Sequence, residues 1–198
     1  MAERLLVVKV GGALSHVPGA LDDVARALPR LARAQPVLVI PGGGPFADQV
    51  RRTQHDLGIS EDAAHWMAIL AMDQYAHLLA DRFSGSRLAD DLDALHEARR
   101  GEVWILAPYR WMKRTDPLPH SWDATSDSIA VVAAAALGAH ELLLVKVVSG
   151  TLETLADALL PSSCPPELEV RCLTTPALLA RAGAEREPPE PAASPAPR

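Results

Sequence analysis

Short hydrophobic runs alternate along the chain with segments in which apolar residues recur every three or four positions. The runs are rich in Val, Ile and Leu and end at glycine, proline or polar residues, which is typical of buried strands. The periodic segments between them are typical of helices. This alternation favours an α/β fold, with a mainly parallel sheet and helices on its faces. The predicted strands are residues 4–10, 36–40, 103–107, 141–148 and 168–173, and the predicted helices are residues 19–34, 45–57, 61–83, 90–99, 128–137, 152–160 and 175–182.

The longest predicted helix covers residues 61–83 and follows Ser60, whose hydroxyl suits the N-cap position. Its apolar residues follow a period of 3.6, so we expect them to face the core. The positions expected in the core are Met67, Leu70, Ala71, Tyr75, Leu78 and Leu79.

Two segments lack these patterns. Residues 108–127, "PYRWMKRTDPLPHSWDATSD", combine prolines with polar residues, so we expect irregular backbone that carries binding groups. Residues 185–198 contain five prolines and no apolar periodicity, so we expect a disordered or extended tail. The expected organisation is one domain over residues 1–184, with a recognisable core in 1–150 and a reduced C-terminal part in 151–184.

Composition and charge exclude several classes of protein. A chain of 198 residues with 48% hydrophobic content can bury one substantial core but not two large domains. The net charge of −6 argues against a nucleic-acid or acidic-membrane partner. No apolar stretch is long enough to span a membrane, so we expect a cytoplasmic protein. Cys164 and Cys172 lack a metal-ligand spacing and the seven histidines are scattered singly, so we expect neither a disulfide framework nor a zinc site.

Glycine-rich turns follow the first two predicted strands. The first contains Gly11 and Gly12, and the second contains Gly42, Gly43 and Gly44 directly before a helix. Consecutive glycines let backbone N–H groups point into one concavity, and a helix N-terminus adds partial positive charge. These turns are therefore either an anion cradle or simply tight connections between strand and helix. The spacing fits neither the dinucleotide-binding motif nor the P-loop.

Two lysines lie near the carboxyl ends of predicted strands, Lys9 in the first and Lys146 in the strand "LLLVKVVSG". They could contact the oxygens of a transferring phosphoryl group, or their ammonium groups could simply reach water at the strand ends. A carboxylate between them, from Asp123 or Asp127, would hold both ammonium groups and could help to bind Mg²⁺. Alternatively, Asp123 or Ser126 caps the helix that follows.

The order "KVGGAL", "PGGGPFADQVR", "DATSDSIA" and then a lysine-bearing strand resembles the amino acid kinase superfamily. "LPHSWDATSDSIA" followed by "LVKVVSG" is similar to the branch of (5-(aminomethyl)furan-3-yl)methyl phosphate kinases of methanofuran biosynthesis, part of one-carbon metabolism. The match covers residues 5–150. The resemblance implies a three-layer αβα sandwich, phosphoryl transfer from ATP with Mg²⁺ to a small molecule, and a homodimer or higher homo-oligomer.

The resemblance also implies roles for individual residues. Those that act on the transferring phosphoryl group are Lys9, Lys146 and Asp127, with Asp127 orienting the lysines and serving as the candidate Mg²⁺ ligand. Those that bind ATP are Gly11, Gly12, Lys146, Ser149 and Gly150. Those that hold the acceptor are Gly42, Gly43, Gly44, His120, Trp122 and Asp123.

Residues 108–127 would face the acceptor in this scheme. Arg110 and Lys113 belong to this segment. Asp123 would pair with an acceptor ammonium group, and Trp122 would either stack on a furan ring or pack in the fold. An acceptor that is itself a phosphate monoester needs no strong general base, since its oxygen is already ionised.

The sequence departs from the superfamily after residue 150, where other members build the pocket for adenine and ribose. Only residues 151–184 precede the tail, so we expect a shortened nucleotide lobe. Two hypotheses remain. The protein is an ATP-dependent phosphotransferase, or it is a non-catalytic anion-binding or assembly protein that retains the kinase fold.

Overall fold

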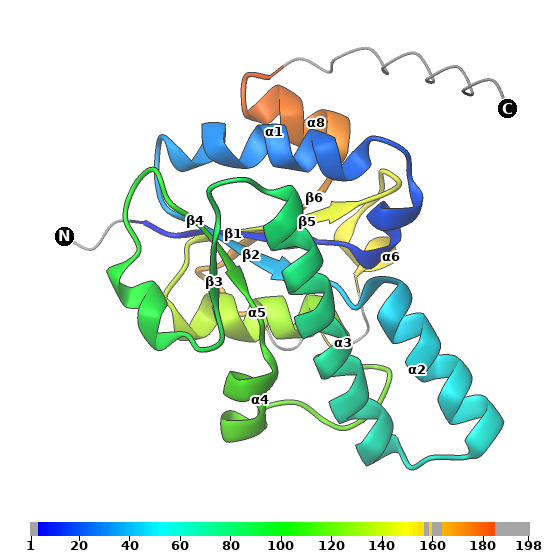
Figure 1. Cartoon of the computed structure of the whole chain (residues 1–198). Helices are drawn as coiled ribbons and strands as arrows, with labels where there is room; N and C mark the ends of the chain where they lie inside the picture. The colour runs from blue at the N-terminus through cyan, green and yellow to red at the C-terminus, as the bar shows by residue number, and fades with distance from the viewer. Residues whose placement is uncertain (1–3, 157–158, 160–163, 185–198) are drawn as a thin grey trace, which may run out of the picture.

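The computed structural model describes residues 4–156, 159 and 164–184, which form a parallel sheet with helices around it (Figure 1). The strands are β1 (Leu6–Val10), β2 (Val37–Pro41), β3 (Arg87–Ala89), β4 (Val103–Leu106), β5 (Glu141–Lys146) and β6 (Glu169–Thr174). They lie in the order β3-β4-β2-β1-β5-β6, and every neighbouring pair is parallel. The predicted α/β class is confirmed.

Helices connect the strands, as parallel pairing requires. The α-helices are α1 (Ala20–Ala32), α2 (Gly44–Leu57), α3 (Glu61–Arg82), α4 (Tyr109–Thr115), α5 (Ser126–Ala136), α6 (Leu152–Leu155) and α8 (Thr175–Arg181). Two short 3-10 helices are η1 (Gly12–His16) and η2 (Asp93–Glu97). Among the described residues, no helix is long and apolar enough to cross a membrane.

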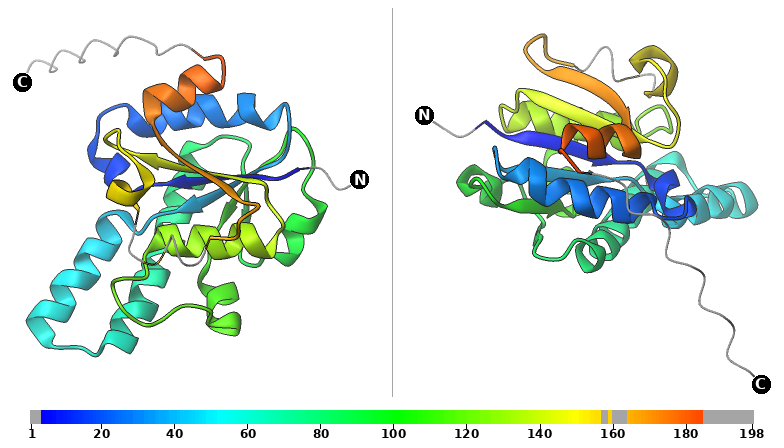
Figure 2. Two further views of the ribbon diagram at one scale, coloured as in Figure 1. Left: turned by 180° about the vertical axis from the view of Figure 1, so that it is seen from behind. Right: turned by 90° about the horizontal axis from the view of Figure 1, so that it is seen from above.

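The helices and the sheet form three layers (Figure 2). Helices α1 and α8 lie side by side over one face, and α5 covers the other. Alternate residues of β1 point to opposite faces. Val8 therefore packs with α1 and α8, while Val7 packs with α5. Burial on both faces explains why β1 and β2 read as continuous apolar runs.

The register of the sheet places both lysines near the carboxyl ends of their strands. Lys9 of β1 pairs with Leu144 of β5, and Lys146 lies two residues further along β5. Residues paired across parallel strands, and those two apart on one strand, share a face. Both lysines therefore point toward the layer that contains α5, at the carboxyl end of the sheet.

Helix α3 begins as predicted, because the Ser60 hydroxyl accepts a hydrogen bond from the backbone N–H of Ala63. Its buried face differs from the prediction. Met67 and Leu70 are exposed, whereas Ile69 and Met72 are buried in the core. The predicted core role is wrong for Met67 and Leu70, because the buried residues of α3 recur every three or four positions along one side of the helix and these two lie outside that stripe.

The prediction of irregular backbone is wrong for part of residues 108–127, since α4 occupies seven of them. Trp111 and Met112 are buried and hold this helix to the core. Pro108 precedes the helix, a position at which proline does not break helical hydrogen bonds. The predicted helix over residues 90–99 is only the 3-10 helix η2, and the short strand β3 was not predicted.

The C-terminal part adds the strand β6 to the sheet and the helix α8 to the layer of α1, with the short helix α6 between β5 and β6. The predicted strand at 168–173 and helix at 175–182 are both present within one residue at each end. Part of the predicted helix 152–160 and the predicted tail 185–198 lie outside the described residues. Neither Cys164 nor Cys172 forms a disulfide bond within the described part of the chain.

Candidate active site

Asp127 lies between the two lysines at the end of the sheet. Its Oδ1 is 2.8 Å from Lys9 Nζ, and its Oδ2 is 2.5 Å from Lys146 Nζ. Lys9 is only 5% exposed and Asp127 only 2%, whereas Lys146 is half-buried. The structure therefore brings together all three residues predicted to act on a phosphoryl group.

Helix α5 positions Asp127 in its first turn. The N-cap is Thr125, whose hydroxyl accepts the backbone N–H of Asp127, so the predicted caps Asp123 and Ser126 are wrong. Thr125 has the extended backbone that an N-cap needs, while Ser126 already belongs to the helix. Burial alone would raise the pKa of Asp127, but the charges of Lys9 and Lys146 outweigh it and hold that pKa below its usual value. Asp127 is therefore a carboxylate that carries one negative charge between two cations.

The two glycine turns pack against each other at the same carboxyl end of the sheet. A Cβ on Gly12 would lie 2.4 Å from the backbone nitrogen of Gly44, and a Cβ on Gly42 would lie 2.5 Å from that of Gly12. The backbone N–H of Gly42 donates to Val10 O over 2.8 Å, and that of Gly11 donates to Val145 O over 3.1 Å. Close packing of backbone therefore requires glycine here, whatever the turns bind.

A cavity of about 330 Å³ opens above these residues. Its lining comes from the glycine turns, η1, the N-terminal parts of α2 and α3, the loop before α5 with the start of that helix, and the ends of β1 and β5. The polar and charged lining residues are Lys9, His16, Asp48, Arg51, Glu61, His65, Ser121, Thr125, Ser126, Asp127 and Lys146, and Gly12, Gly43, Gly44 and Trp122 also line it. Cations and carboxylates thus face the same space.

Trp122 forms one wall of the cavity and is held by α2. Its Nε1 donates to Gln54 Oε1 over 2.6 Å, and the Arg51 guanidinium lies 4.3 Å from the centre of the indole ring. Arg51 also pairs with Asp48 one turn earlier, at 3.1 Å. Neither Arg51 nor Asp48 was singled out from the sequence, although both lie in the stretch "PFADQVR". Their spacing of three on a predicted helix directly after the glycine turn was the available signal.

Several predicted site residues lie away from the cavity. His120 is hydrogen-bonded to Asp62 and Asp116, and Asp123 to Ser121. Neither His120 nor Asp123 lines the cavity, and neither do Gly11, Gly42, Ser149 and Gly150. Ser149 and Gly150 are exposed in the segment after β5.

The two basic residues predicted near the acceptor are also engaged elsewhere. Arg110 forms an ion pair with Asp90 at 3.0 Å. Lys113 Nζ lies 3.8 Å from the centre of the Trp66 ring. Both side chains are exposed on α4.

Comparison with known families agrees with this geometry. The model of the amino acid kinase family matches residues 4–154, which is most of the chain. The chain belongs to this family. The match ends just beyond β5, so it includes both lysines, both glycine turns and Asp127.

Individual members of the amino acid kinase family resemble the chain to different degrees. The [5-(aminomethyl)furan-3-yl]methyl phosphate kinase of Methanocaldococcus jannaschii is 32% identical over 145 residues, covering 73% of this chain and 66% of that protein. The crystal structure of uridylate kinase from Archaeoglobus fulgidus has a TM-score of 0.57 and 20% identity, covering 75% of this chain and 65% of its own. The chain therefore spans just under two thirds of the length of these relatives.

Two other solved kinases share the fold. UMP kinase from Ureaplasma parvum has a TM-score of 0.56 and 17% identity, covering 75% of this chain and 68% of its own. Aspartate kinase from Synechocystis has a TM-score of 0.53 and 17% identity, covering 74% of this chain and 29% of its own. These structures confirm the amino acid kinase architecture predicted from the motifs, and the Methanocaldococcus relative confirms the predicted resemblance to the aminomethylfuran phosphate kinases.

Proposed function

We propose that the protein transfers a phosphoryl group from ATP to a small acceptor that already carries a phosphate. The observation that carries this proposal is the buried ion cluster of Lys9, Asp127 and Lys146 on the floor of the cavity. Two fixed ammonium groups neutralise the charge that develops on phosphoryl oxygens, and in-line transfer depends mainly on such positioning and neutralisation. A phosphate acceptor supplies its own ionised oxygen, so no protein general base is needed.

The residues present fit a nucleotide with its magnesium ion. Gly12, Gly43 and Gly44 line the same cavity as Lys9 and Asp127, and the partly exposed Lys146 lines it too. When bound, MgATP would supply the phosphoryl group and the metal charge on its oxygens. Both oxygens of Asp127 contact lysines, which favours its role in orienting the ammonium groups. Its role as Mg²⁺ ligand, and the contacts of Gly11, Gly12, Ser149 and Gly150 with ATP, remain predictions.

We propose a phosphorylated aminomethylfuran as the acceptor, in biosynthesis of a methanofuran-type cofactor. The name of the Methanocaldococcus relative supports this choice. The cavity offers cations for a phosphate, the indole of Trp122 for a flat ring, and the carboxylates of Asp48 and Glu61 for an ammonium group. These two carboxylates replace Asp123, which does not line the cavity, as the proposed partners of the amine.

Phosphoryl transfer should be measured directly with MgATP and (5-(aminomethyl)furan-3-yl)methyl phosphate, by following ADP and the diphosphate product. We expect Lys9→Met and Lys146→Met each to lower kcat/KM at least ~100-fold, because each removes a cation from the transferring group. Lys113→Met is the matched control, since it removes the third lysine of the chain from an exposed site on α4. Equal activity of all three variants would contradict the proposal.

The alternative is a binding or assembly protein that keeps the anion site. Calorimetric titration of the folded protein with MgATP and a non-hydrolysable analogue distinguishes the two functions. Binding that weakens in Lys9→Met and Lys146→Met supports the kinase. A folded protein that binds inorganic phosphate but not MgATP would favour the alternative.

We also propose that the protein forms a homodimer. Met67 and Leu70 on α3 leave apolar surface exposed, which a second copy could cover. Sedimentation equilibrium of the wild type and of Leu70→Glu tests this proposal. A wild-type mass equal to that of one chain would overturn it.

A further inference from the structure

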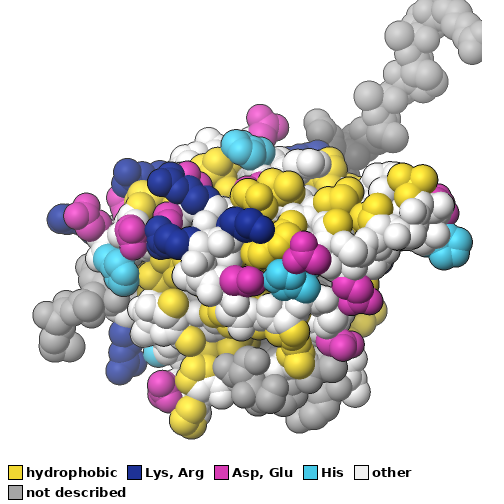
Figure 3. Space-filling model, turned by 90° about the horizontal axis from the view of Figure 1, so that it is seen from below, with side chains coloured by type: hydrophobic (Ala, Val, Ile, Leu, Met, Phe, Trp, Pro, Cys, Tyr) yellow, Lys and Arg dark blue, Asp and Glu magenta, His cyan; other side chains and the backbone are white. Residues whose placement is uncertain are grey.

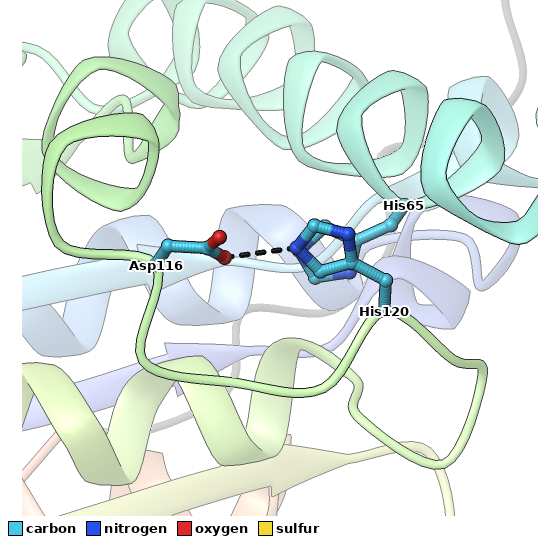
Figure 4. A group of neighbouring side chains, drawn as sticks. All are labelled: His65, Asp116 and His120. Atoms are coloured by element: carbon cyan, nitrogen blue, oxygen red, sulfur yellow. Dashed lines mark hydrogen bonds and ion pairs between the residues drawn. The ribbon is translucent and has the colours of Figure 1, made fainter.

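A second cluster of chemically active side chains lies next to the cavity, which one of its members lines (Figure 4). It consists of His65 from α3, Asp116 directly after α4, and His120 from the loop that follows. Each side chain offers one ligand atom, and these three atoms lie within 4.8 Å of one another. Asp116 and His120 are four residues apart after α4, whereas His65 is distant from both in the sequence and meets them only through the fold.

We propose that His65, Asp116 and His120 bind a transition-metal ion such as Zn²⁺, and that this ion fastens the loop before α5 to α3. Two imidazoles and one carboxylate form a donor set that suits Zn²⁺ and related ions, and leave a position for water. The same donors disfavour Mg²⁺, which prefers oxygen ligands. The proposed ion is therefore distinct from the magnesium of the kinase reaction, and its binding does not depend on that function.

His65 supplies the first observation in favour of this site. It is only 9% exposed, and its Nε2 is buried without a hydrogen-bond partner among the described residues. A buried nitrogen with no partner is costly, so such an atom calls for an explanation. A metal ion would supply the missing partner.

His120 supplies the second observation, because both of its ring nitrogens face carboxylates. Nε2 lies 2.8 Å from Asp116 Oδ1, and Nδ1 lies 2.7 Å from Asp62 Oδ1. Histidines that bind metals usually donate their other N–H to a carboxylate, which fixes the ring and strengthens the ligand. Asp62 is already in the place of that outer carboxylate, and the ion would replace the proton between His120 and Asp116.

The two imidazole rings must turn out of their stacked arrangement before both can bind one ion. The His65 and His120 rings are stacked, with centres 4.1 Å apart and planes at 17°. Two zinc bonds of about 2.1 Å at a tetrahedral angle span about 3.4 Å between ligand atoms, so the rings must tilt toward each other. Asp116 and His120 lie in or beside a loop and are at least partly exposed, so they can move. The Trp66 ring packs nearly perpendicular to both imidazoles, with its centre 4.9 Å from that of His65 and 5.1 Å from that of His120.

The location of this cluster gives the ion a role. His65 itself lines the cavity, and the loop that carries His120 also supplies Leu118, Ser121 and Trp122 to the lining. An ion that joins His120 and Asp116 to His65 would fix this loop against α3 and so hold the wall of the cavity. The face of the molecule seen from below mixes acidic, basic, histidine and apolar side chains (Figure 3).

Zinc binding should be measured by calorimetry on the full chain, after removal of any affinity tag and dialysis against EDTA. We expect one ion per chain and a rise in melting temperature with zinc. His65→Gln, Asp116→Asn and His120→Gln should each weaken binding more than about 100-fold, and Asp62→Asn about 10–100-fold. His55→Gln is the matched control, because His55 forms an exposed pair with Asp56 at 2.9 Å and does not belong to the cluster.

A measurement on the wild type keeps the proposal testable even if a variant fails to fold. Co²⁺ added to the apo protein should give the intense visible absorption of a four- or five-coordinate site, and excess Mg²⁺ should not reduce it. Absence of stoichiometric zinc binding in the folded wild type would overturn the proposal. Equal loss of binding in His55→Gln and in the three ligand variants would also overturn it. Metal binding that persists in Lys9→Met keeps this inference separate from the outcome for phosphoryl transfer.

Discussion

At the scale of single residues, the cluster of Lys9, Asp127 and Lys146 is stable because one carboxylate forms ion pairs with two ammonium groups. Removing a charge from water costs several kcal/mol unless it is closely paired. Each Asp127 oxygen has its own ammonium partner, and Lys146 keeps contact with the cavity. The cluster therefore carries a net positive charge next to the cavity, where a phosphate would bind.

Replacement of Asp127 by asparagine should remove most of this stabilisation. We expect Asp127→Asn to lower the free energy of unfolding by about 3 kcal/mol at neutral pH, because two ammonium groups lose their counter-charge. Urea denaturation measures this change. Asp22→Asn is the control, since Asp22 forms only an exposed pair with Arg82 and should cost less than about 1 kcal/mol.

The same carboxylate should make stability depend on pH. The folded pKa of Asp127 is lowered, so its contribution is fully present above the unfolded value of about 4 and is lost as the pH falls through the folded pKa. The wild type should therefore lose stability on acidification more steeply than Asp127→Asn. Parallel curves for the two proteins below about pH 4 would contradict the ion cluster.

At the scale of elements, the N-terminus of α5 determines where Asp127 lies. The Thr125 hydroxyl accepts the Asp127 N–H, and a carboxylate in the first turn interacts favourably with the helix dipole. The position of Asp127 thus depends in part on this helix cap, while Lys9 and Lys146 keep it charged.

Loss of this cap should be measurable in stability and in activity. We expect Thr125→Ala to lower the free energy of unfolding by about 1 kcal/mol, with a fall in melting temperature of about 2–4 °C. Thr125→Ser keeps the hydroxyl and should stay close to the wild type in both stability and phosphoryl transfer. If Thr125→Ser lowers stability and phosphoryl transfer as much as Thr125→Ala, the hydroxyl does not stabilise the start of α5.

At the scale of the whole molecule, the C-terminal part completes the sheet and the layer above it. Strand β6 pairs with β5 along its length, and α8 packs beside α1. Arg181 of α8 reaches back to the buried Glu141 of β5, with its Nη2 2.6 Å from Glu141 Oε2. The segment after β5 is therefore integral to the core, even though the family match ends at residue 154.

Truncation of a core side chain in α8 should therefore destabilise the whole protein. Leu178 is fully buried among residues of the sheet and α1, so Leu178→Ala should cost about 2–5 kcal/mol. Leu57→Ala, at a position 74% exposed, should change stability by no more than about 0.5 kcal/mol. Coincident unfolding curves from circular dichroism and tryptophan fluorescence would show one cooperative unit. A separate early transition in Leu178→Ala would show that α8 is only appended.

The sequence by itself determined the α/β class, most strands and the elements that carry the lysines and glycine turns. These follow from local properties: hydrophobic periodicity, glycine at strand ends and a capping serine at position 60. Parallel strands place their carboxyl ends at the same end of the sheet. The proximity of Lys9, Lys146 and the glycine turns was therefore also predictable. Asp127 could be chosen beside Asp123 only with the help of the family resemblance.

Tertiary structure alone decided the remaining features, because they depend on which surfaces pack together. Helix α4 forms where prolines suggested irregular backbone, since Trp111 and Met112 find places in the core. Arg51 meets Trp122 across the cavity wall. His65 and His120, scattered singly in the sequence, stack only because α3 and the loop after α4 fold against each other. Side chains far apart in the chain share no local signal, so only their packing could show that they meet.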